Sequence, residues 1–160
     1  MIELSLVGVR VELPSNQPIV LLKESDGERY LPIWIGAVEA TAIAFALQGI
    51  ETPRPMTHDL MRDILRQTDT EVERIVINDL VDQTFFATIR MSGEGKTTEV
   101  SSRPSDAIAL AVRINAPLFA SEEVLEQAGI ELKDEEESEV EKFREFLDQV
   151  TPEDFASDQG

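Results

Sequence analysis

Residues 101–113 read Ser-Ser-Arg-Pro-Ser-Asp-Ala-Ile-Ala-Leu-Ala-Val-Arg, a polar turn that runs directly into an Ala-rich apolar segment. Arg103 should be extended, because the proline that follows it pushes its backbone out of the α region. Ser105 is then placed to cap a helix that begins there. The small apolar residues of this helix form one stripe, which consists of Ala107, Ile108, Ala111 and Val112 with Ala109 beside it. We therefore expect the helix to pack closely against a sheet.

The polar residues of this turn have two interpretations. Asp106 lies in the first helical turn, where the positive end of the helix dipole stabilises a carboxylate. Ser105 and Asp106 would then serve only to start the helix. Alternatively, Arg103, Ser105 and Asp106 project together from the turn as a functional site, since polar groups gather in the loops of many α/β proteins. The spacing alone leaves both interpretations open.

The segments before the central helix show strand and helix patterns in turn. Period-2 alternation predicts a first strand over residues 2–13 with a bulge at Gly8, followed by strands over 19–22 and 30–35. Trp34 is expected in the core. Helices are predicted over 37–48, with Ala40, Ile43, Ala44 and Leu47 inward, and over 58–66, capped by Thr57, with Leu60, Met61, Ile64 and Leu65 inward.

The remaining pattern adds a hairpin and completes one domain. Strands are predicted over 71–80 and 84–91 as a hairpin, over 97–102 before the central helix, and over 118–120 after it. Ser121 should cap a short helix over 122–128. We thus expect an α+β domain over residues 1–132, in which a mostly antiparallel or mixed sheet packs against Ala-rich helices.

Charge is concentrated toward the C-terminus. The 160 residues carry a net charge of −18, of which residues 1–132 hold −10 (21 acids and 11 bases) and residues 133–160 hold −8 (11 acids and 3 bases). Residues 133–160 are expected to form an acidic linker and an amphipathic helix, whose apolar side chains need a partner in this domain or in a second copy of a homo-oligomer. The acidic balance disfavours nucleic acid as a partner, because duplex binding depends largely on Lys and Arg that neutralise phosphates.

Composition also bounds the location and the chemistry. The chain has no cysteine, which excludes disulfides, thiolate metal sites and thiol nucleophiles. No run approaches the roughly 18 apolar residues of a membrane span, and the N-terminus lacks the pattern of a signal peptide. We expect a soluble, cytoplasmic protein with no membrane partner.

Three blocks of sequence together resemble the bifunctional nuclease (BFN) domain family. In chain order they are Leu31-Pro-Ile-Trp-Ile-Gly36 with Glu39-Ala40, Arg54-Pro-Met-Thr-His-Asp-Leu60, and Arg103-Pro-Ser-Asp-Ala-Ile-Ala-Leu-Ala111. Each block alone is weak, but their combination in this order over about residues 1–132 is specific. The resemblance implies an α+β domain and an association with cleavage of both DNA and RNA. It implies neither a mechanism nor a set of catalytic residues.

Matching to these blocks supplies candidate site residues for a nuclease. Hydrolysis of a phosphodiester needs an activated water and neutralisation of negative charge, and carboxylates that hold one or two divalent ions provide both. The catalytic candidates are His58, Asp59 and Asp106; the substrate-binding candidates are Arg54, Arg103 and Ser105; and the metal ligands, for Mg²⁺ or Mn²⁺, are Glu39, Asp59 and Asp106. Arginine offers bidentate contacts to phosphate, and histidine is the side chain whose unperturbed pKa lies near neutrality.

A second function stays open beside the nuclease. His58, the one histidine of the chain, is also consistent with a helix-start residue that bonds a neighbouring carboxylate. Under this hypothesis the candidate site residues serve as helix caps and ion pairs of a non-catalytic regulatory or scaffolding domain. Such a domain can be monomeric or oligomeric. Convergence of Glu39, Asp59 and Asp106 in the fold would favour a shared site, whereas wide separation would contradict it.

Overall fold

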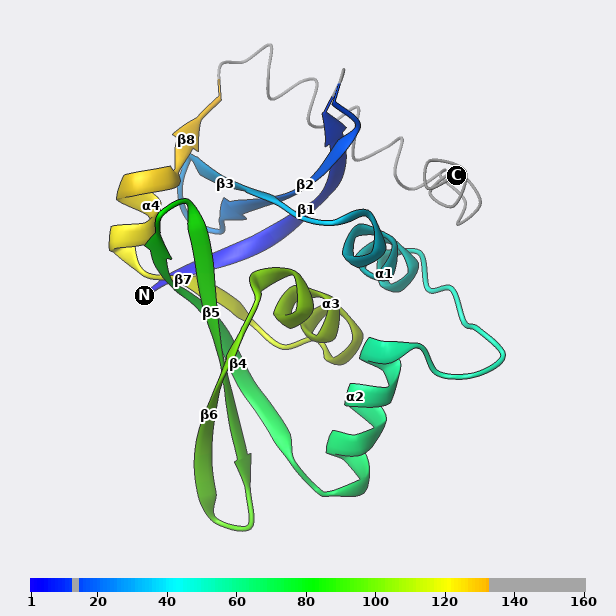
Figure 1. Cartoon of the computed structure of the whole chain (residues 1–160). Coiled ribbons are helices and arrows are strands. Elements are labelled where there is room, and N and C mark those ends of the chain that lie inside the picture. The colour runs from blue at the N-terminus through cyan, green and yellow to red at the C-terminus, as the bar shows by residue number, and fades with distance from the viewer. Residues whose placement is uncertain (13–14, 133–160) are drawn as a thin grey trace.

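The fold is built on one mixed β-sheet, described for residues 1–12 and 15–132 in a computed structural model of the chain (Figure 1). In the order of the sheet, the strands are β6 (Lys96–Ser102), β5 (Thr84–Gly93), β4 (Glu71–Val81), β7 (Leu118–Ala120), β1 (Ile2–Glu12), β2 (Gln17–Glu24), β3 (Arg29–Trp34) and β8 (Ile130–Glu131). All neighbours are antiparallel except β4 and β7, which are parallel. The short β7 therefore joins the meander of β1, β2 and β3 to the unit of β4, β5 and β6.

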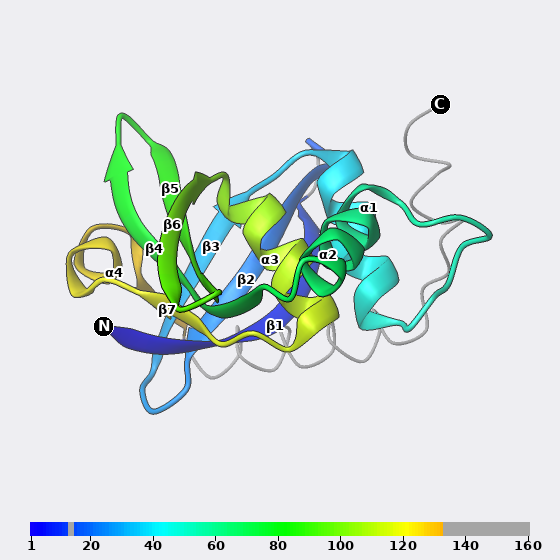
Figure 2. The same ribbon diagram turned by 90° about the horizontal axis from the view of Figure 1, so that it is seen from below.

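Three helices gather on one side of this sheet, as Figures 1 and 2 show. They are α1 (Ala37–Leu47), α2 (Thr57–Gln67) and α3 (Pro104–Ile114), whereas α4 (Glu122–Ala128) packs separately against β3 and β4. The predicted α+β class, with a mostly antiparallel, mixed sheet and Ala-rich helices, is confirmed. The predicted C-terminal amphipathic helix falls outside the described residues.

The helix α3 lies at the centre of the fold. It packs against α1 and α2 and also against β4 and β5. Residues 107–111 are each at most 2% exposed, because these five successive residues are all apolar and span a full turn, and the alanines among them let neighbours approach closely. The predicted stripe is therefore confirmed, although burial extends beyond it to Leu110.

Local sequence signals predicted many details correctly. The bulge expected at Gly8 is present, since the register between β1 and β2 shifts between Leu6 and Gly8. Ser121 caps α4, because its hydroxyl accepts a hydrogen bond from the backbone N–H of Val124. The strand β8 had no such signal, since a two-residue strand that pairs with Tyr30 and its neighbour has no periodicity of its own.

Two helix starts differ from the prediction. The helix α3 begins at Pro104 rather than at Ser105, because proline suits the first helical position. Ser105 consequently lies buried in the first turn. The predicted capping residue Thr57 is instead the first residue of α2, and the cap comes from the carboxylate of Asp59, which accepts a hydrogen bond from the backbone N–H of Met56.

Several apolar side chains predicted to be buried are exposed, namely Trp34, Leu47, Leu60 and Ile64. Both α1 and α2 pack against α3, so each buries a narrower stripe than a helix lying flat on a sheet. Trp34 ends β3 between Ile33 and Ile35, which are buried. Because successive side chains of a strand point to opposite faces, the indole of Trp34 turns toward solvent.

Within residues 1–12 and 15–132, no helix combines the length and the apolar character that a membrane crossing requires. The domain boundary at residue 132 and the cytoplasmic location stay predictions.

Candidate functional site

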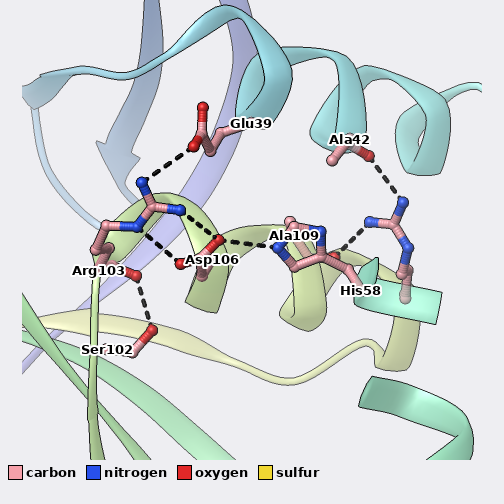
Figure 3. A network of polar contacts seen from close by, with 8 residues as sticks. Glu39, Ala42, His58, Ser102, Arg103, Asp106 and Ala109 are labelled. Carbon is pink, nitrogen blue, oxygen red and sulfur yellow. Dashed lines mark hydrogen bonds and ion pairs between the residues drawn. The ribbon is translucent and has the colours of Figure 1, made fainter. Parts of the chain in front are cut away.

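The turn between β6 and α3 presents a network of charged side chains (Figure 3). Arg103 occupies the N-cap position of α3 with the extended backbone expected before a proline (φ −68°, ψ 142°). Its Nε and Nη2 donate hydrogen bonds to the two carboxylate oxygens of Asp106 at 2.8 and 3.1 Å. Its Nη1 forms an ion pair with Oε1 of Glu39 in α1 at 3.0 Å. One guanidinium thus joins the first turns of α1 and α3.

His58 adds α2 to this network. Its Nε2 lies 3.0 Å from Oδ1 of Asp106, and the residue is 7% exposed. An ionised carboxylate only accepts hydrogen bonds, so Nε2 carries the proton that is donated to Asp106. We call the set of Glu39, His58, Arg103 and Asp106 the Arg103 network.

The electrostatic environment keeps Asp106 ionised. Burial opposes the charged form, but hydrogen bonds from Arg103 and His58 outweigh it and hold the pKa of the Asp106 carboxyl below its usual value. The contacts with Asp106 and Glu39 in turn raise the pKa of Arg103. Side-chain exposure increases from 9% for His58 to 29% for Asp106 and 63% for Arg103. The guanidinium is therefore the part of these three side chains most accessible to solvent.

A second network, the Arg113 network, lies further along α3. The Nε of Arg113 donates to Oδ1 of Asp59 at 2.6 Å, while its Nη1 and Nη2 donate to the backbone oxygens of Ala109 and Ala42 at 2.7 and 3.0 Å. The Arg113 side chain is 5% exposed. Burial opposes the charge of Asp59, but the hydrogen bonds from Arg113 and from the Met56 N–H prevail and lower the pKa of Asp59. This network binds α1, α2 and α3 to one another.

A pocket of about 370 Å³ opens beside Arg103. The end of β3, the turn between β4 and β5, and the start of α3 form its walls. Arg103 and Ser105 line it from α3, and Trp34 and Phe85 line it from the two strand segments. Its volume lies within the range of about 300–1,000 Å³ that small-molecule sites occupy. The exposed guanidinium therefore stands next to a cavity that can hold a small ligand.

The structure unites some of the predicted site residues and separates others. The Arg103 network holds four of them, Glu39, His58, Arg103 and Asp106. Asp59 instead contacts Arg113. Ser105 lines the pocket next to Arg103, whereas Arg54 is exposed in the segment between α1 and α2. The roles assigned to these residues stay predictions.

The three carboxylates predicted as metal ligands are not arranged as a metal site. The guanidinium of Arg103 pairs with both Glu39 and Asp106 and so offsets part of their negative charge, while Asp59 pairs with Arg113. Across residues 1–12 and 15–132, no three His, Cys, Asp or Glu side chains are placed together to hold a metal ion. This arrangement does not fit a divalent ion, so no chemical step is assigned to one, and Mg²⁺ and Mn²⁺ enter only as additions to the cleavage assays proposed below.

Comparison with known proteins gives the network a family context. Residues 20–133 match the bifunctional nuclease domain. The chain belongs to the bifunctional nuclease domain family. All three blocks that resemble this BFN family lie inside the matched range, so the resemblance is confirmed.

Similar proteins fall into two groups. Uncharacterized protein Rv1829 of Mycobacterium tuberculosis (strain ATCC 25618 / H37Rv) is 48% identical over 162 residues, which cover 96% of this chain and 97% of that protein. Bifunctional nuclease 2 of Oryza sativa subsp. japonica is 27% identical over 127 residues, or 77% of this chain and 39% of the plant protein. Bifunctional nuclease 1 of Arabidopsis thaliana is 29% identical over 105 residues, or 63% and 32%. The BFN domain chain thus matches only a part of each plant nuclease.

The three BFN blocks meet in space at the Arg103 network and its pocket. The first block contributes Trp34 to the pocket and Glu39 to the network. The second contributes His58, and the third contributes Arg103 and Asp106. Segments far apart in the sequence therefore form one local site.

Two features of this BFN site were missed from the sequence. Arg113 had a usable signal, because a charged residue that ends an otherwise apolar helix must reach water or a buried partner. The position of Trp34 at the pocket had no sequence signal. Residues 30–35 are almost all apolar, so their pattern does not show which face of the strand is buried.

Proposed function

We propose that this BFN domain protein is a nuclease that cleaves phosphodiester bonds of DNA and RNA at the Arg103 network. The observation that carries the proposal is the exposed guanidinium of Arg103, held beside the pocket by Asp106 and Glu39. Arginine has five N–H donors. Three of them meet Asp106 and Glu39, which leaves two for the oxygens of a phosphate. The names of the plant relatives support the same reaction.

The network supplies groups that phosphodiester hydrolysis requires. The two remaining N–H groups of Arg103 donate hydrogen bonds to the phosphate, whose negative charge must be stabilised in the transition state. Asp106 orients a water molecule and accepts its proton while the water oxygen forms the new P–O bond. The P–O bond to the leaving nucleotide breaks, and the leaving oxygen takes a proton from solvent. His58 is too buried to meet the substrate directly, so its hydrogen bond positions Asp106.

A non-catalytic regulatory or scaffolding role is the second candidate function. One observation favours it, because each carboxylate of the Arg103 network is already paired with arginine or histidine, as in ion pairs that only hold helices together. Under this alternative the network has no substrate, and oligomerisation is the property to measure.

Cleavage assays on matched variants test the proposal. Purified protein is incubated with single-stranded and double-stranded DNA and RNA, with chelator and with added Mg²⁺ or Mn²⁺. Arg103→Ala should reduce cleavage about a hundredfold, whereas Arg90→Ala, which removes an arginine from exposed pairs with Glu73 and Glu99, should not.

The same variants also report on stability. Because Arg103 is mostly exposed, its removal should cost little more than the roughly 1 kcal/mol of an exposed ion pair.

Wild-type cleavage by both Arg103→Ala and Asp106→Asn would reveal a contaminating nuclease and refute the site. A folded, pure protein that cleaves none of the four substrates would instead favour the second candidate.

A further inference from the structure

The pocket beside Arg103 contains a feature that the proposed cleavage chemistry does not use. Trp34, the single tryptophan of the chain, lines this pocket and is 51% exposed. An aromatic side chain of this size buries about 150–250 Å² in a core, so the fold forgoes part of that stabilisation. The exposed half of the indole lies beside a cavity, where a bound ligand can cover it.

The neighbours of Trp34 indicate the chemistry of the ligand. Phe85 adds a second aromatic ring to the wall, and Arg103 places a cation at the same pocket. Gln17 and Gln83 are exposed and contribute amide groups, each of which donates and accepts hydrogen bonds. Together these side chains complement a ligand that has a flat aromatic ring, a negative charge and polar edges. A nucleotide combines all three features.

The charge of the protein narrows the choice further. A net charge of −18 opposes long-range attraction of a polyanion. Binding must therefore come from short-range contacts, and stacking of a base on an aromatic side chain is one that needs no positive charge. A duplex hides the faces of its bases in its own stack, whereas a single strand can expose them.

We propose that this pocket binds one unstacked base of single-stranded DNA or RNA. Trp34 stacks on the face of the base, and Arg103 binds an adjacent phosphate. The side-chain amides of Gln17 and Gln83 contact the base edge and can adapt to more than one base. The proposal rests on the proposed nuclease function and specifies its substrate as single-stranded nucleic acid.

Fluorescence of the unmodified protein gives a direct test. Because Trp34 is the only tryptophan, its emission reports on this pocket alone. A single-stranded oligonucleotide of about 12 nucleotides, added at fixed ionic strength and recorded within seconds, should quench the emission. An abasic strand with the same phosphates and a duplex of the same sequence should not. Equal quenching by the abasic strand would overturn the stacking, and equal quenching by the duplex would overturn the preference for single strands.

Variants test the same site by affinity. Trp34→Ala should weaken binding of a labelled single strand about tenfold, and Trp34→Phe should restore most of the affinity. Phe86→Ala is the matched control, since Phe86 is an exposed aromatic residue that does not line the pocket. Wild-type affinity in Trp34→Ala would contradict the proposal. If no oligonucleotide bound, the proposed base site would also be contradicted. A side chain of a protein partner would then be the remaining candidate to fill the pocket.

Parallel cleavage assays separate the two proposals. A wild-type protein that binds single strands through Trp34 but does not cleave them would refute the nuclease function and support the base site. Cleavage of single strands with an unchanged KM in Trp34→Ala would refute the base site and leave the nuclease function intact.

Discussion

Replacing Asp59 with alanine should strongly destabilise the protein, because it leaves the guanidinium of Arg113 buried without its charge partner. The side chain of Arg113 is 5% exposed, and its Nε lies 2.6 Å from Asp59. The backbone oxygens of Ala109 and Ala42 satisfy other N–H groups of this side chain but supply no negative charge. Breaking a buried ion pair costs about 3–5 kcal/mol, and loss of the cap that Asp59 provides to Met56 adds about 1 kcal/mol.

Urea and thermal unfolding followed by circular dichroism measure this loss. Since about 1 kcal/mol shifts the Tm of a chain of this size by about 2–4 °C, a loss of about 4–6 kcal/mol corresponds to about 8–24 °C. The control Glu73→Ala also removes a carboxylate from an arginine, but from Arg90, whose side chain is 35% exposed rather than buried, and should cost at most about 1 kcal/mol.

A second substitution tests the cause of the effect. Arg113→Met in the Asp59→Ala background removes the orphaned charge and should recover much of the lost stability, because apolar replacements of buried ion pairs are often neutral. If Asp59→Ala cost no more than Glu73→Ala, or if the double variant recovered nothing, the ion pair would not be what holds α2 against α3.

Three further predictions concern stability. The pKa values of Asp59 and Asp106 are lowered in the folded state, so the stability that these carboxylates contribute is present above their unfolded pKa of about 3.9 and is lost at lower pH. The free energy of unfolding should therefore be flat from about pH 7 to pH 5 and fall below about pH 4. A free energy of unfolding that does not change with acid would contradict this. Ala109→Leu should cost about 1–3 kcal/mol by overpacking a fully buried position, whereas Ala37→Leu at an exposed position should leave the Tm nearly unchanged. A chain that ends at Leu132 should keep one cooperative melt, and its loss would move the domain boundary.

The fold was largely predictable where local periodicity decides the structure. The bulge at Gly8 and the Ala-rich helix α3 both follow from residues close in sequence. The buried face of α2 does not, because His58 turns inward to reach Asp106, 48 positions later, and this leaves Leu60 and Ile64 exposed. A long-range polar contact thus overrides the apolar pattern, which no local window can reveal.

The sequence predicted which residues carry the polar groups of the site, but not which of these residues contact one another. His58 and Asp59 are adjacent, and neighbouring helical residues diverge by about 100°. His58 accordingly contacts Asp106, while Asp59 contacts Arg113. Which carboxylate meets which arginine depends on how α1 and α2 pack against α3, so the predicted grouping of three carboxylates could not be decided from spacing.

Arg103 at the N-cap of α3 and Arg113 in its last turn make similar contacts but serve different roles. Arg113 is enclosed by three helices, and its N–H groups meet a carboxylate and backbone oxygens, so its contribution is to stability. Arg103 makes comparable contacts with carboxylates but is 63% exposed beside a pocket that Trp34 lines. Since exposure rather than pairing distinguishes them, variants at Arg113 should change unfolding and variants at Arg103 should change binding. Observation of both effects at both positions would show that the two networks act as one unit and that the site cannot be separated from the core.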